Sequence, residues 1–162
     1  MGLALLSLGS NIEPARHLAS AATALRQAFP DVRFSPVYRY VAVGFDGPDF
    51  LNAGAALTTA LSPEALNGWL HALEDAHGRR RDVPRFSSRT LDIDLVFYDG
   101  LMCEGPGNLK LPRPELKHAF VLEPLAALVP EFVDPLSGKT LAALWSAHAD
   151  HAHRAHAEPL DL

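Results

Sequence analysis

The chain has 162 residues, of which 48% are hydrophobic and 20% charged, and its formal net charge is −5. This length and composition are typical of one folded domain, residues 1–162, that builds its core without disulfides or a structural metal. The negative charge argues against nucleic acid or a membrane surface as a partner, and no apolar run reaches the roughly 20 residues that span a bilayer. The single cysteine, Cys103, fits a reducing compartment, so we expect a cytoplasmic monomer without a secretion signal.

Strand-like and helix-like patterns alternate along the chain. The apolar run LALLSL (3–8) predicts a buried strand, and the following Gly-Ser-Asn with Pro14 is a helix-start signal. Pro36 inside VRFSPVYRYV (32–41) indicates a strand at a sheet edge or with a bulge, because proline has no amide hydrogen for the ladder. In full, the sequence predicts strands at 3–8, 32–41, 50–60 and 91–98, helices at 14–29 and 63–77, and short helical pieces at 114–128 and 140–149.

This β-α-β-β-α-β order is the split βαβ, or ferredoxin-like, arrangement of an α+β fold. We expect a four-stranded antiparallel sheet with the two long helices on one face and extra helices at the C-terminal end. The final stretch, about 150–162, is rich in histidine and is expected to be a mobile, partly helical tail, although its histidine spacing also allows a transition-metal site. Because this fold is shared by many unrelated functions, the function has to be inferred from the site.

Two carboxylates stand inside the strand-like run TLDIDLVFY (90–98). Residues i and i+2 of a strand point to the same face, so Asp92 and Asp94 project together, opposite Leu91, Ile93 and Leu95. Such neighbours stay ionised only beside a compensating positive charge, which Mg²⁺ supplies through oxygen ligands. The alternative is that both acids lie on a solvent-facing surface and pair loosely with arginines.

A basic loop precedes the two acids. HGRRRDVPRFSSR (77–89) holds five arginines within eleven positions, 79–89. The guanidinium group is a planar fork that matches phosphate oxygens and keeps its charge near neutral pH. A cation between carboxylates and phosphates, with arginines around them, is what phosphoryl transfer requires. The alternative is a solvated loop paired with local acids; no Walker-type or kinase glycine-rich sequence occurs.

Arg89-Thr90-Leu91-Asp92-Ile93-Asp94 resembles the R-T-L-D-[IL]-D signature of the 6-hydroxymethyl-7,8-dihydropterin pyrophosphokinase family. Four further blocks resemble family blocks in the same order: LSLGSNI near the start, PDFLNAGAALTT at 48–59, LEDAHGRRR at 73–81 and AFVLEPLAALVPEF at 119–132. The resemblance covers roughly residues 3–135. It implies a folate-pathway enzyme that transfers pyrophosphate from ATP, its co-substrate, to the hydroxyl of 6-hydroxymethyl-7,8-dihydropterin. The hydroxyl would attack the β-phosphorus directly, with release of AMP.

The resemblance also implies roles for the acids and the basic loop. Asp92 and Asp94 would hold two Mg²⁺ ions that bridge the ATP phosphates and the attacking hydroxyl and stabilise charge on the leaving oxygen. Arg79 and Arg89 match arginines that contact phosphates and support catalysis. Arg81 matches a further position, at the nucleotide, that helps to close the loop over the substrates.

For the pterin, the resemblance implies a flat slot with amide-like partners. Phe50 and Phe120 match two aromatic residues that stack on the ring, and Asn52 matches an amide that contacts its edge with both a donor and an acceptor. Backbone groups of 40–44, those of Val43 among them, would add edge contacts. Ordinary core packing is the alternative for the two phenylalanines.

Three more positions have family counterparts. His71 and Glu74 lie three apart on one helix face and match a Gln/Glu pair near the nucleotide, with His71 in place of the usual Gln. An imidazole can still donate a hydrogen bond there. Asn11 matches an asparagine near the pterin, and its alternative role is a helix cap.

The remaining nucleotide positions depart from the family pattern. Arg113 and His118 stand where the family has His and Arg, and Lys110 is a candidate substitute for an arginine replaced by Asn108. Phe86 replaces a tryptophan of the loop. We expect Phe86, Lys110, Arg113 and His118 to contact ATP and the departures to mark a subfamily with the same chemistry. A changed pterin preference or a weakened activity are the alternatives.

Two functions of other classes account for part of the pattern. A glycosyltransferase also uses an Asp-x-Asp motif, but the chain shows no sign of a nucleotide-sugar domain. A diverged module of the same fold would bind a pterin or a nucleotide without turnover. Only the altered segment around Arg113 and His118 favours that module, and the intact Arg89, Asp92 and Asp94 argue against it.

Overall fold

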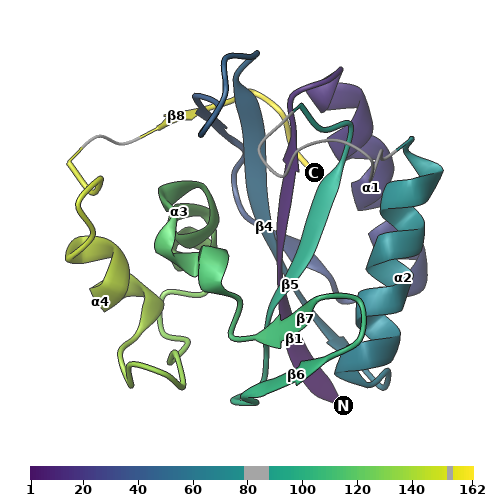
Figure 1. Ribbon diagram of the computed structural model, residues 1–162, viewed down its shortest axis with the longest axis vertical. Helices are drawn as coiled ribbons and strands as arrows, with labels where there is room; N and C mark the ends of the chain where they lie inside the picture. The colour runs from purple at the N-terminus through teal and green to yellow at the C-terminus, as the bar shows by residue number, and fades with distance from the viewer. Residues whose placement is uncertain (79–87, 153–154) are drawn as a thin grey trace.

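The computed structural model describes residues 1–78, 88–152 and 155–162, and an antiparallel sheet lies at its centre (Figure 1). The sheet strands are β1 (Gly2–Ser10), β2 (Arg33–Phe34), β3 (Tyr38–Tyr40), β4 (Phe50–Thr59), β5 (Asp92–Tyr98) and β8 (His156–Ala157). Their order is β5-β1-β4-β3-β8, with β2 also paired to β4, and each of these pairs is antiparallel. The strands β6 (Cys103–Gly105) and β7 (Leu109–Leu111) form a separate hairpin. The helices are α1 (Pro14–Ala28), α2 (Pro63–Ala76), α3 (Ala119–Leu128) and α4 (Leu141–Ser146), with a 3₁₀ turn, η1 (Pro114–Lys117), before α3.

The sheet is covered on both faces because its central strand is apolar on both sides. Leu6 and Leu8 of β1 pack into one core, which also holds the apolar stripes of α1 and α2, whereas Leu5 packs into a second core with α3 and α4. Figure 1 shows the two helix pairs on opposite sides of the sheet. The prediction of a buried first strand, with the two long helices on one face, is therefore confirmed. The C-terminal helices cover the other face.

The two long helices begin where the sequence predicts them. Pro14 and Pro63 each occupy the first turn of their helix, where a missing amide hydrogen costs nothing. Ser62 caps α2, because its Oγ accepts a hydrogen bond from the Ala65 amide at 3.1 Å. Burial of Leu66 and Leu70 then fixes α2 against the sheet, at about 1.5–3 kcal/mol for each side chain. This packing brings the last turns of α2 beside β5.

Strand β5 lies at the edge of the sheet and carries a bulge. Leu6 of β1 is opposite Leu95, but Leu5 is opposite Phe97, so one extra residue of β5 stands between these pairs. Before the bulge, Ile93 and Leu95 point into the core beneath α1 and α2; after it, Val96 and Phe97 both face the core beneath α3. On the face of β5 toward α3, the strand therefore carries acids at its start, Asp92 and Asp94. At its end it carries the apolar Val96 and Phe97, which the bulge brings to one face.

The structure corrects the prediction for two other segments. The stretch 32–41 is two short strands and not one, because the ladder is interrupted at Ser35-Pro36; the Ser35 hydroxyl accepts a hydrogen bond from the Gly54 amide at 2.8 Å. The stretch 99–113, for which the sequence predicted neither a strand nor a helix, contains the β6–β7 hairpin. The helical piece predicted at 114–128 is divided at His118 into η1 and α3.

The C-terminal stretch returns to the sheet. His156 and Ala157 form β8 and pair with Arg39 and Tyr38 of β3, and the Glu158 carboxylate lies 2.7 Å from Nε of Arg39. We predicted a partly helical tail, which is wrong for 156–157; its mobility stays a prediction. Within the described ranges, no helix is both long enough and apolar enough to cross a membrane.

Candidate active site

A cavity of about 230 Å³ lies where β1, β4 and β5 face the beginning of α3. Eleven of the predicted site residues line it, from five separate parts of the chain. Those predicted to contact the pterin are Val43, Phe50, Asn52 and Phe120. Those predicted to contact the nucleotide or to take part in catalysis are His71, Glu74, Arg89, Asp92, Asp94, Arg113 and His118. The structure therefore brings both predicted groups to one cavity.

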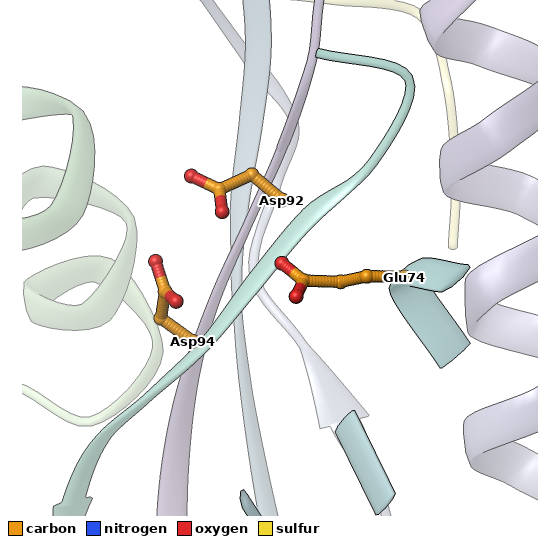
Figure 2. Close-up of side chains that lie close together, drawn as sticks. All are labelled: Glu74, Asp92 and Asp94. Carbon is orange, nitrogen blue, oxygen red and sulfur yellow. The ribbon is translucent and has the colours of Figure 1, made fainter. Parts of the chain in front are cut away.

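Three carboxylates gather at the edge of this cavity (Figure 2). Asp92 and Asp94 project from the same face of β5, as strand alternation predicts, and Glu74 reaches the strand from α2. One oxygen from each of the three carboxylates lies within 4.8 Å of the others. Glu74 is held in place because its Oε2 accepts a hydrogen bond from the Ile93 amide at 3.0 Å, at the outer edge of the sheet. The resemblance implies that Glu74 lies near the nucleotide, and the structure places it with the two aspartates.

Burial and the neighbouring carboxylates both act on the charge of Asp94. Burial is the main cause that raises the pKa of Asp94 well above its ordinary value, and the charge of Asp92 adds to it. Arg113 opposes this effect, since its Nη2 lies 3.2 Å from Oδ1 of Asp94. Clustered carboxylate oxygens are the ligand set that a hard divalent cation prefers. The three residues thus fit Mg²⁺.

Arg113 is fixed beside the cluster by the segment that precedes η1. Its amide donates to the Val96 carbonyl at 3.0 Å, and its guanidinium lies between Asp94 and Glu115, with Nε 3.4 Å from Glu115 Oε2. The side chain is mostly buried. A guanidinium held in this way offers a fixed positive charge to a polyanion at the cavity.

Asn52 faces the cavity from the middle of the sheet. Its Nδ2 donates to the Leu8 carbonyl at 3.3 Å, whereas its Oδ1 is buried and has no hydrogen-bond partner among the described residues. Gly9 makes room for the amide, because a Cβ at that position would lie only 2.6 Å from Asn52 Nδ2. A buried acceptor without a donor costs about 1–3 kcal/mol, which a bound ligand with an N–H group would offset.

The aromatic residues approach the cavity from two sides. Phe50 stands at the start of β4, in edge contact with Phe45, at 6.3 Å between ring centroids. Phe120 stands in the first turn of α3, and the His118 ring stacks on it at 4.9 Å with an interplanar angle of 11°. Both phenylalanines line the cavity and neither is fully buried, although Phe120 also packs against the core beneath α3 and α4.

Asn11 lies beside the cavity wall, and its place near the pterin stays a prediction. It does not line the described cavity, and it is no helix cap, since α1 begins at Pro14 and its cap residue is Glu13. Instead, Oδ1 of Asn11 accepts from the Arg89 amide at 2.8 Å, its own amide donates to the Arg89 carbonyl at 3.0 Å, and Nδ2 donates to the Pro48 carbonyl. These bonds fix the backbone of the buried Arg89 at the cavity wall.

Among the residues that the structure describes, Lys110 is another predicted site residue that does not line the cavity. Lys110 is exposed on β7 and lies 3.6 Å from Glu104, away from the lining. Arg79, Arg81 and Phe86 lie outside the described residues, so their roles stay predictions.

Some residues of the cavity wall were not predicted from the sequence. Ser7, Phe45 and Glu115 line the cavity without having been predicted, and the side chain of Tyr40 lines it although only its backbone groups were predicted. Alternation along β1 would have placed Ser7 on the face of Gly9. No local signal distinguishes Tyr40 or Glu115.

The fold and the site together define a class: an enzyme that would bind a cation-associated polyanion beside a flat heterocycle. A family model for 7,8-dihydro-6-hydroxymethylpterin-pyrophosphokinase matches residues 5–130. A 2-amino-4-hydroxy-6-hydroxymethyldihydropteridine pyrophosphokinase from Synechocystis is 39% identical over 145 residues, which are 87% of this chain and 73% of that protein. Proteins with the same name from Pseudomonas aeruginosa and Haemophilus influenzae are 37% and 33% identical, over 88% and 91% of this chain and 89% and 94% of theirs. The chain belongs to this pyrophosphokinase family.

A solved structure supports the fold. The Plasmodium falciparum HPPK-DHPS chain superimposes with a TM-score of 0.67 at 12% identity, over 90% of this chain. This chain spans 44% of that longer one. At such identity the likeness concerns the mixed α and β fold with its antiparallel sheet.

Proposed function

We propose that this chain transfers the pyrophosphoryl group of ATP to the hydroxyl of 6-hydroxymethyl-7,8-dihydropterin, giving the pterin diphosphate and AMP. The observation that carries the proposal is the single cavity that holds the three-carboxylate cluster, Arg113, Asn52 and the two phenylalanines. The names of the relatives and the family model support the same reaction. In this reaction the hydroxyl oxygen forms a bond to the β-phosphorus, the bond to the α,β-bridging oxygen breaks, and AMP leaves with that oxygen.

The chain's own residues would bind and orient the two substrates. Phe50 and Phe120 stack on the pterin, and Asn52 offers its unpaired Oδ1 to an N–H group at the edge of the ring. Arg89 and Arg113 place fixed positive charge at the phosphates, and His71 and His118 lie at the same cavity. Arg79 and Arg81, if they act as the resemblance implies, complete this positive charge from the basic loop.

Mg²⁺ would be held by Asp92 and Asp94, with Glu74 beside them. When bound, it neutralises the phosphates and stabilises the charge that develops on the leaving oxygen. Binding of Mg²⁺ accounts for the two acids in β5, since a cavity that only stacked a heterocycle would not require them.

Further proposals rest on the same evidence. The strand order β5-β1-β4-β3, with α1 and α2 on one face of the sheet, supports a ferredoxin-like arrangement of these four strands and two helices. We also propose that the chain is one domain that acts as a cytoplasmic monomer. A binding module without turnover is the other candidate, and the carboxylate cluster argues against it.

Mass spectrometry of the pterin after incubation with the purified chain and Mg-ATP tests the reaction. The proposal predicts a product that is heavier by two phosphoryl groups. A product with one phosphoryl group, or pterin recovered unchanged, would refute it. A parallel incubation with EDTA in place of Mg²⁺ is the control and should give no product.

A further inference from the structure

Two walls of the cavity come from parts of the chain that share no backbone hydrogen bonds with each other among the described residues. One wall is the segment 40–45 after β3, and the other is the beginning of α3. β3 pairs with β4 and β8 only. Side chains therefore have to set the distance between these two walls.

Tyr40 provides a link between them. Its hydroxyl donates a hydrogen bond to Oε1 of Glu123 at 2.6 Å, from the end of β3 to α3. Its ring lies in edge contact with Phe120, one turn before Glu123 on the same helix, at 6.4 Å between centroids. Tyr40 lines the cavity, so one residue connects the cavity wall, the stacking aromatic and the helix that carries it.

The link is constrained by burial at its far end. Glu123 is only 6% exposed, and no ion pair joins it to any described residue. A buried carboxylate is costly unless a donor satisfies it, and the Tyr40 hydroxyl is that donor. Burial, and next the hydrogen bond to Glu123, raise the pKa of Tyr40, so the phenol stays protonated and donates at neutral pH.

We propose that Tyr40 and Glu123 are a positioning pair that sets the width of the aromatic slot and thereby selects the flat pterin substrate. The inference rests on the proposed function. The pair acts through Phe120 and the 40–45 segment and leaves phosphate binding to other residues. Removal of the hydrogen bond should therefore affect the pterin and not ATP.

The substitution Tyr40→Phe removes the hydroxyl and keeps the ring. We expect the KM for the pterin to rise about tenfold, in line with the loss of one partly buried hydrogen bond, with the KM for ATP unchanged. The single variant Glu123→Gln keeps an acceptor for the Tyr40 hydroxyl, so its KM for the pterin should stay close to that of the wild type. Glu123→Leu removes the acceptor and should behave like Tyr40→Phe.

Tyr98→Phe is the matched control. Tyr98 is a buried tyrosine whose hydroxyl donates a hydrogen bond to the backbone carbonyl of Leu61, but it lies in the other core and outside the cavity lining. It should lose thermal stability while the KM for the pterin stays unchanged. A pterin KM that is unchanged in Tyr40→Phe, or raised equally in Tyr98→Phe, would overturn the inference while pterin diphosphate formation by the wild type continued. Absence of that product from the wild type would overturn the proposed function itself.

Discussion

Replacement of Asp94 by asparagine separates the charge of this side chain from its shape. In the wild type, carboxylate oxygens of Asp92 and Glu74 lie within 4.8 Å of one of Asp94. At an effective dielectric constant of about 20, each repulsion amounts to about 3 kcal/mol. Arg113, at 3.2 Å, contributes an attraction of about 5 kcal/mol. The two repulsions together exceed the attraction, and burial of the carboxylate adds to the cost.

The Asp94→Asn protein should therefore be at least as stable as the wild type without metal. In EDTA, scanning calorimetry should give a Tm that is unchanged or higher by up to about 4 °C. The value of kcat/KM should fall by about 10²–10³ or more, because a charged ligand worth roughly 3–4 kcal/mol is lost. Added Mg²⁺ should raise the Tm of the wild type and leave that of the variant unchanged.

The same pair of proteins tests the electrostatics of the cluster. Because folding raises the pKa of Asp94, this group adds stability below its unfolded pKa of about 3.9 and loses that contribution as the pH rises through the folded value. In EDTA, the unfolding free energy of the wild type relative to Asp94→Asn should therefore fall from about pH 4 upward. The affinity for Mg²⁺ should rise over the same range, since the cation binds the deprotonated form. A variant that unfolds readily in EDTA, or keeps most of its activity, would refute this reasoning.

Three further substitutions test how the cavity is built. Gly9→Ala would place a Cβ 2.6 Å from Asn52 Nδ2 and displace the amide. Steady-state kinetics should then show a KM for the pterin that is about tenfold higher or more, with the KM for ATP unchanged. An unchanged KM for the pterin would mean that Asn52 does not contact the ring. Asn11→Ala removes the bonds to the backbone of Arg89 and Pro48, so urea unfolding should show a loss of about 1–3 kcal/mol, and kcat should fall more than KM changes; an effect on the pterin KM alone would instead support direct contact. Arg89→Ala should lower kcat more than it weakens ATP binding measured by calorimetry, and a loss confined to KM would count against a role in the transition state.

Hydrophobic periodicity predicted β1, α1, α2 and β5 because each buries a long apolar face. It missed the β6–β7 hairpin, whose strands of three residues are too short to show alternation. It also missed β8, because the pairing of His156 with Arg39 joins segments that are distant in sequence. Such contacts depend on the rest of the fold and leave no local pattern.

In the site, too, some features follow from local sequence patterns and others depend on tertiary packing. The common face of Asp92 and Asp94 follows from strand alternation alone. The approach of Glu74 to them follows from the packing of α2 beside β5, and the resemblance placed Glu74 near the nucleotide but not beside the aspartates. The bond between Tyr40 and Glu123 spans 83 positions, so sequence periodicity could not reveal it.

The measurement that tests the central claim most directly is the identity and amount of nucleotide released per pterin consumed. Chromatography of a reaction that contains the purified chain, Mg-ATP and 6-hydroxymethyl-7,8-dihydropterin should show one AMP for each pterin consumed and no ADP. ADP in that ratio would mean transfer of a single phosphoryl group. No nucleotide turnover while the pterin still binds would contradict the account and leave a binding module in its place.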